Sequence, residues 1–190
     1  MTIPDISRSP LILVDENDMI IGYSFRDACH RGDGVLHRAY SIFIFNSQKE
    51  LLIQQRSLNK ELWPLFWSNS CCSHPRKYEN YSQSAHRRLT EETGLVSNLV
   101  YLYKFTYQAN YNNLGSENEM CAIFIGKSDA SVIVDKSEIN DFKWVSMDYL
   151  REDLKLNRHF YTPWFILEFE QLDSKYRSTI ENLFVSETRD

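Results

Sequence analysis

The sequence predicts an α/β fold in which one β-sheet is covered by helices on both faces, within a single domain spanning residues 1–190. Short runs of β-branched and aromatic residues alternate with helical segments, a pattern that favours strands interleaved with helices. A chain of 190 residues can bury one hydrophobic core, and 43% apolar and 25% charged residues are ordinary for a globular protein. There are no repeats, low-complexity tracts or linkers that would divide the chain.

The N-terminal half predicts mainly strands. The turn residues DEND and SQK each separate two extended runs. Between these pairs lies a polar loop, SFRDACHRGDGVLHR, which holds His30 and His37. The four expected strands are LILV (11–14), MIIGY (19–23), SIFIFN (41–46) and ELLIQQR (50–56).

The C-terminal half predicts three helices and three more strands. SQSAHRRLTEET (82–93) is a helix that ends at Gly94, because glycine readily adopts the left-handed conformation that terminates helices. Ser146 caps a short helix over MDYLRED. Thr162, followed by a proline, opens a long helix to about Phe184. The expected strands are LVYLYKFTYQ (99–108), EMCAIFIG (119–126) and DFKWVS (141–146).

Composition argues against several classes of protein. A net charge of −5 offers no broad basic surface for a nucleic acid. The first twenty residues contain one short apolar run, so neither a signal peptide nor a membrane span is predicted. Four irregularly spaced cysteines do not resemble a secreted disulfide framework. We therefore expect a cytoplasmic protein without a membrane or nucleic-acid partner.

The segment SHPRKYENYSQSAHRRLTEETGL, about residues 73–95, contains a motif typical of diphosphate chemistry. Its spaced positions are Glu79, Arg87, Glu91, Glu92 and Gly94. They resemble the Nudix box, G-x5-E-x7-R-E-U-x-E-E-x-G-U, a loop–helix–loop that holds divalent metals over a diphosphate. Ser73 replaces the first glycine of the box, and Arg88 replaces its first helical glutamate. Alone, RRLTEE would be a solvated, salt-bridged helix, but the complete spacing favours the motif.

Histidines and carboxylates elsewhere form a second candidate metal site. His30 and His37 share a loop, and His74 lies in NSCCSHP. Glu117 and Glu119 are two residues apart, so on a strand both carboxylates face the same side. Three imidazoles and two carboxylates suit a borderline divalent ion such as manganese, iron or zinc.

The adjacent cysteines in NSCCSHP have three candidate roles: reactive thiol, metal ligand or small buried side chain. In an extended segment alternate residues face the same way, which places Cys72 beside His74 and Cys71 on the opposite side. Cys29 and Cys121 have no comparable context and are interpreted as packing residues.

Together, WSNSCCSHP, ENE and the degenerate Nudix box resemble the type I isopentenyl-diphosphate isomerases, over about residues 26–164. The resemblance implies a Nudix-type mixed β-sheet sandwiched between helices. It also implies interconversion of isopentenyl and dimethylallyl diphosphate, by adding one proton and removing another. One Mn²⁺ or Zn²⁺ in a His3Glu2 site and Mg²⁺ on the substrate diphosphate are expected, with no flavin or nicotinamide. The implied partner is a small diphosphate, and the implied state is a monomer or weak dimer.

The same resemblance implies roles for individual residues. Cys72 and Glu119 match the essential cysteine and glutamate, and Tyr107 can pass a proton. The implied metal ligands are His30, His37, His74, Glu117 and Glu119 for the tight ion, with Glu92 for magnesium. The implied substrate-binding residues are Arg26, Arg56, Lys60, Arg87, Trp67 and Trp164, with Tyr107 also lining the isoprenoid pocket.

Two rival functions remain at this point. A Nudix hydrolase of a nucleoside diphosphate derivative would need a carboxylate where Arg88 stands. A non-catalytic module with zinc at Cys71, Cys72 and His74 would leave the paired glutamates and the histidine loop unexplained. The sequence does not determine whether Cys72 or Glu119 donates the proton in the forward direction.

Overall fold

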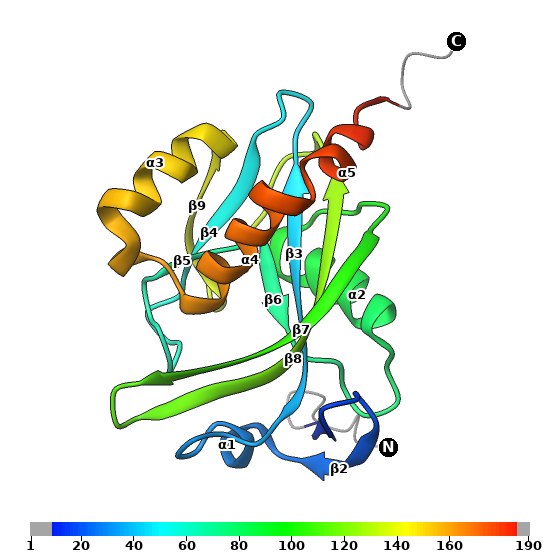
Figure 1. Cartoon of the computed structure of the whole chain (residues 1–190), viewed down its shortest axis with the longest axis vertical. Helices are drawn as coiled ribbons and strands as arrows, with labels where there is room; N and C mark the ends of the chain where they lie inside the picture. The colour runs from blue at the N-terminus through cyan, green and yellow to red at the C-terminus, as the bar shows by residue number, and fades with distance from the viewer. Residues whose placement is uncertain (1–8, 186–190) are drawn as a thin grey trace.

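Nine strands form one mixed sheet within residues 9–185, the part of the chain that this computed structural model describes (Figure 1). The strands are β1 (Leu11–Val14), β2 (Ile20–Ser24), β3 (His37–Phe45), β4 (Leu51–Arg56), β5 (Trp67–Ser68), β6 (Cys71–Ser73), β7 (Val100–Tyr111), β8 (Gly115–Lys127) and β9 (Ile139–Val145). β3 is parallel to β8 and antiparallel to β1, β4 and β6. The two ends of the predicted 1–190 domain lie outside the described residues.

Helices cover both faces of this sheet (Figure 1). They are α1 (Arg26–Cys29), α2 (Tyr81–Thr93), α3 (Met147–Asn157), α4 (Pro163–Lys175) and α5 (Arg177–Asn182), with a 3-10 turn at Arg158–Phe160. α3, α4 and α5 pack on one face and α2 on the other. The predicted α/β class, with a mixed sheet between helices, is confirmed. Among the described residues, no helix has the length and apolar character needed to cross a membrane.

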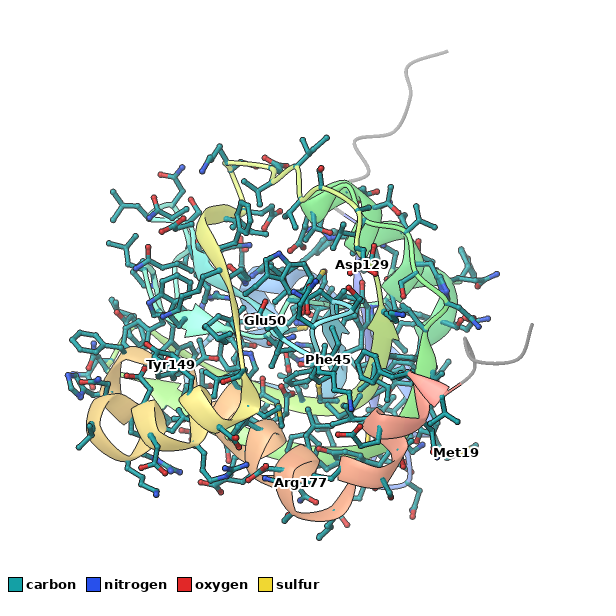
Figure 2. The ribbon with its side chains drawn as sticks, turned by 90° about the horizontal axis from the view of Figure 1, so that it is seen from above. Met19, Phe45, Glu50, Asp129, Tyr149 and Arg177 are labelled. Carbon is teal, nitrogen blue, oxygen red and sulfur yellow. The ribbon has the colours of Figure 1, made fainter. Side chains whose placement is uncertain are left out.

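β3 is buried on both sides because its side chains alternate between the two helical layers. Phe43 and Phe45 belong to the core beneath α4, whereas Ile42 and Ile44 belong to the core beneath α2. In the view from above, Phe45 lies inside the fold and Tyr149 lies at its periphery (Figure 2). The central strand is therefore a rigid support for the residues at its N-terminal end.

The helix predicted at residues 82–93 is confirmed as α2. Asn80 caps it by accepting a hydrogen bond from the Gln83 amide, and the Gln83 side chain accepts one from the Asn80 amide. Gly94 ends the helix with a φ of 69°, in the left-handed region that favours glycine.

The C-terminal helix was predicted to continue to about Phe184, and this is wrong. α4 ends at Lys175, and Tyr176 leaves the helical conformation with a φ of −114° before α5 begins. The Tyr176 ring stacks on Tyr103, with 4.8 Å between ring centroids. The continuous amphipathic pattern gave no sign of this break.

Of two further local predictions, one is confirmed and one is wrong. Thr162 was predicted as the N-cap of α4, followed by proline at the first helical position, and both are confirmed. The Thr162 hydroxyl makes no cap hydrogen bond and lies 2.9 Å from the Ser68 hydroxyl instead. Arg26 was predicted in a loop, but it begins the single helical turn α1.

The β7–β8 hairpin extends away from the helices and reaches the α1 segment (Figure 1). The Ser116 amide donates to the His30 carbonyl over 2.9 Å. A Cβ atom on Gly115 would lie 2.5 Å from the same carbonyl oxygen, so only glycine permits this approach. The contact brings His30 close to the start of β8 and the carboxylates that follow.

Candidate active site and metal centre

Three histidines and two glutamates meet where β3, β6, β8 and α1 come together. His37 is the register partner of Glu119 across the parallel β3–β8 pair. Glu117 precedes it on the same face of β8, His74 follows β6, and His30 follows α1. One ligand atom from each of the five residues lies within 4.8 Å of all the others. The structure therefore assembles the whole predicted His3Glu2 set.

Backbone carbonyls fix the orientation of two of these imidazoles. The Nδ1 of His30 lies 2.7 Å from the Arg26 carbonyl, and the Nδ1 of His37 lies 2.7 Å from the Val35 carbonyl. A carbonyl can only accept, so Nδ1 carries the hydrogen and Nε2 presents a lone pair to the cluster. This is the tautomer that a metal-binding histidine needs.

Several buried polar atoms of the cluster have no hydrogen-bond partner: Nε2 of His30 and His37, and Oε2 of Glu117. The Nε2 of His30 lies only 2.8 Å from Glu117 Oε2, but the pair lacks hydrogen-bond geometry. Burying such atoms without partners is costly, and a divalent cation would satisfy them together. The donor set therefore fits a divalent metal ion.

Electrostatics favour the neutral imidazole of His37 and of His74. Burial, together with neighbouring His30, lowers the pKa of His37 to about 4. Burial and the other two imidazoles lower the pKa of His74 well below its usual range. Burial and the charge of Glu117 raise the pKa of Glu119. Neutral histidines are the form that binds metals, so these shifts agree with the donor geometry.

Glu119 is held from two sides. Its Oε1 lies 2.8 Å from His74 Nε2, and its Oε2 accepts a hydrogen bond of 2.5 Å from the Tyr107 hydroxyl. Tyr107 is the register partner of Glu119 across the β7–β8 pair, which explains the contact. Both side chains are largely buried. Glu119 is thus a member of the His3Glu2 set and also contacts a hydroxyl that can carry a proton.

The two adjacent cysteines face opposite sides of β6, as predicted. Cys71 is fully buried in the core beneath α2, whereas Cys72 faces the other core and lines the cavity beside the metal cluster. Burial raises the pKa of Cys72 to about 12, so its thiol holds its proton at neutral pH. The Sγ of Cys72 lies 4.0 Å from the guanidinium of Arg56.

This cavity joins the two acid–base candidates to a group of cations. Its polar lining includes Cys72, Glu119 and the cations Arg26, Arg56, Lys60 and Arg88, and Tyr107 and Trp164 line it as well. Arg56 is almost fully buried and is fixed by hydrogen bonds to the carbonyls of Trp63 (3.0 Å) and Leu62 (2.8 Å). Its guanidinium lies 5.2 Å from the centre of the Trp164 ring.

Three of the predicted site residues lie elsewhere. Trp67 does not line the cavity. The Lys143 ammonium lies over the Trp67 ring, 4.5 Å from the ring centre. Arg87 pairs with Glu79 on the surface of α2, at 2.8 Å. Glu92 is buried beside Cys71, where it accepts a hydrogen bond from Arg88.

Arg88 is the cavity residue that sequence reasoning missed. It was interpreted only as the loss of a metal-binding carboxylate, yet its side chain lines the cavity. The signal was available, because a cation that replaces a carboxylate in a diphosphate motif can bind the diphosphate directly. Ser41 and Tyr40 also line the cavity, and no sequence motif marked them.

Comparison with known proteins agrees with this geometry. Residues 35–165 match the family described as NUDIX domain. The chain is 40% identical over 164 residues to "Isopentenyl-diphosphate Delta-isomerase 1" of Photorhabdus laumondii, covering 85% of this chain and 93% of the relative. It is 44% identical over 154 residues to the protein of the same name in Aromatoleum aromaticum, covering 81% of this chain and 86% of that one.

Solved structures show the same fold. DR0079 from Deinococcus radiodurans superposes with a TM-score of 0.64 at 24% identity, covering 78% of this chain and 90% of that one. The MutT protein of Methanosarcina mazei gives a TM-score of 0.63 at 19% identity, covering 75% and 96%. The chain therefore belongs to the Nudix family and, within it, to the isopentenyl-diphosphate Delta-isomerases.

Proposed function

We propose that this protein interconverts isopentenyl diphosphate and dimethylallyl diphosphate. The observation that carries the proposal is one cavity lined by two acid–base groups, Cys72 and Glu119, and by a cluster of four cations. Moving a double bond requires a proton to be added at one carbon and removed at another, so two such groups must flank the substrate. The relatives at 40% and 44% identity are named for this reaction.

The residues divide the work between the two ends of the substrate. Arg26, Arg56, Lys60 and Arg88 bind the diphosphate through charge-assisted hydrogen bonds. One of Cys72 and Glu119 protonates the terminal alkene carbon, which leaves a tertiary cation. The other removes a proton from the neighbouring carbon on the diphosphate side of that cation. The faces of Tyr107 and Trp164 stabilise that cation, each by about 0.5–2 kcal/mol.

The metal cluster supports this chemistry through Glu119. We infer that His30, His37, His74, Glu117 and Glu119 hold one Mn²⁺ or Zn²⁺. When bound, the ion orients Glu119 and adjusts its proton affinity. Glu92 stays the proposed ligand for Mg²⁺ on the diphosphate, because magnesium prefers carboxylate oxygens. Its carboxylate lies behind Arg88, from which it accepts a hydrogen bond, so binding the ion would require it to exchange that partner.

A product assay tests the proposed function. Purified protein supplied with Mg²⁺ and isopentenyl diphosphate is expected to form an allylic diphosphate, which ionises easily and is therefore acid-labile. The fraction of acid-labile diphosphate is measured against time. No acid-labile product after full metal loading would reject the isomerase assignment.

The metal site makes a prediction that does not depend on activity. The purified protein should contain about one transition-metal or zinc ion per chain, because five donors converge on one point. His37→Ala removes a fully buried donor and is expected to lower that content several-fold. Metal is measured by elemental analysis, with His159→Ala, an exposed histidine, as the matched control. Full occupancy in His37→Ala would remove His37 from the proposed site.

A further inference from the structure

The turn at residues 135–138 connects two parts of the cationic end of the cavity. The Ser57 amide, just beyond β4, donates to the carbonyl of Glu138 over 2.9 Å. The Asp135 amide donates to the carbonyl of Glu92, in the last turn of α2, over 2.9 Å. The backbone of this turn is therefore anchored both to the segment that leads to Lys60 and to the helix that carries Arg88.

The side chain of Glu138 makes the same connection. Its carboxylate accepts hydrogen bonds from the Lys60 ammonium and from the Arg88 guanidinium, the latter over 2.9 Å. Lys60 and Arg88 line the cavity, whereas Glu138 is not part of that lining and is 22% exposed. One carboxylate outside the cavity thus holds two cations that reach it from different elements.

The arrangement leaves donors available for a ligand. One terminal nitrogen of Arg88 bonds to Glu91 at 3.0 Å, and the other bonds to Glu92 and Glu138. Its Nε is buried and has no partner. A lysine ammonium has three donors, so Lys60 can bond to Glu138 and to a phosphate oxygen together. Glu138 therefore need not leave when an anion binds.

We propose that Glu138 is a positioning residue that pre-organises Lys60 and Arg88 to bind the substrate diphosphate, an inference that rests on the proposed function. Long charged side chains lose substantial rotamer freedom when they are fixed on binding. A partner that fixes them beforehand reduces this cost and increases affinity. It also offsets the repulsion between the two cations while the substrate is absent.

The pairing keeps Glu138 charged over the working pH range. Burial would raise its pKa, but Lys60 and Arg88 outweigh that effect and lower the pKa to about 2. Its contribution is therefore expected to be independent of pH between about 5 and 8.

The test separates binding from chemistry. Glu138→Gln keeps the size of the side chain and removes its charge. We expect the KM for isopentenyl diphosphate and the Kd for inorganic pyrophosphate, with Mg²⁺ present, to rise about ten-fold. kcat should stay within about two-fold, because an interaction present in both ground state and transition state is lost. Glu138→Asp keeps the charge on a shorter side chain, so its KM and Kd should lie between those of the wild-type protein and those of Glu138→Gln.

Glu91→Gln is the matched control, because Glu91 also pairs with Arg88 but lies on the exposed side of α2. Because Glu91 contacts only one of the two cavity cations, and from the exposed side of the helix, Glu91→Gln should raise KM and Kd clearly less than Glu138→Gln does. In a Lys60→Gln background, Glu138→Gln should cost clearly less than it does alone, because one of its two targets is missing. Thermal unfolding confirms that each variant is folded.

Three results would overturn the proposal. They are unchanged or tighter pyrophosphate binding by Glu138→Gln, equal losses in Glu91→Gln and Glu138→Gln, and full additivity with Lys60→Gln. Pyrophosphate binding is measured without turnover. If the wild-type protein binds pyrophosphate but forms no allylic product, the proposed function is rejected. The role of Glu138 is then decided by the pyrophosphate affinities of the variants alone.

Discussion

Cys72→Ser is expected to lower kcat for isomerisation by about 10²- to 10⁴-fold, the range for removing a general acid or base. The Cys72 side chain lines the reaction cavity, and a serine hydroxyl is a much weaker acid than a thiol. The substitution is nearly isosteric, so pyrophosphate affinity should change little. The measurement is kcat by the acid-lability assay, on protein with its metal content determined.

Cys71→Ser is the matched control, one residue away on the opposite side of β6. Cys71 packs beneath α2 and does not line the cavity. A hydroxyl at this site costs about 1–3 kcal/mol of unfolding free energy if it finds no partner, but the folded fraction should keep most of its activity. Comparable losses of kcat in the two folded variants would contradict the assignment of the catalytic thiol to Cys72.

Glu119→Gln should lower kcat by a similar 10²- to 10⁴-fold, because the amide cannot exchange a proton with the substrate. Its oxygen can still accept the hydrogen bond from Tyr107, so the local structure is expected to persist. Elemental analysis accompanies the kinetics, to separate lost chemistry from lost metal. A metal-loaded Glu119→Gln variant with more than about a tenth of wild-type kcat would remove Glu119 from the proton-transfer step.

Strand periodicity predicted the parts of the site that lie close together in sequence. The two-residue repeat placed Glu117 with Glu119 and Cys72 with His74, and the structure confirms both pairs. The parallel register that sets His37 beside Glu119 depends on a pairing between distant strands. Local patterns do not specify which strands meet, so this pairing was not predicted.

Helical and aromatic residues were harder to place. The pattern of α2 did not distinguish Arg88, which lines the cavity, from Arg87, which pairs with Glu79 on the surface. Both arginines also contact Glu91, so the salt-bridge pattern does not show which of the two lines the cavity. Trp67 is a large aromatic residue of the kind that lines apolar pockets, but its ring packs against the Lys143 ammonium instead. Tertiary packing decides such cases, and local propensity does not.

Deuterium incorporation tests whether the protein transfers protons to and from an intact diphosphate substrate. Metal-loaded protein is incubated with isopentenyl diphosphate and Mg²⁺ in heavy water, and the products are followed by proton and phosphorus NMR. We expect dimethylallyl diphosphate with deuterium at the carbon that was the terminal alkene carbon, and negligible release of phosphate. Rapid phosphate release from nucleoside diphosphate derivatives, with no deuterium and no double-bond migration in isopentenyl diphosphate, would contradict this expectation and indicate a hydrolase.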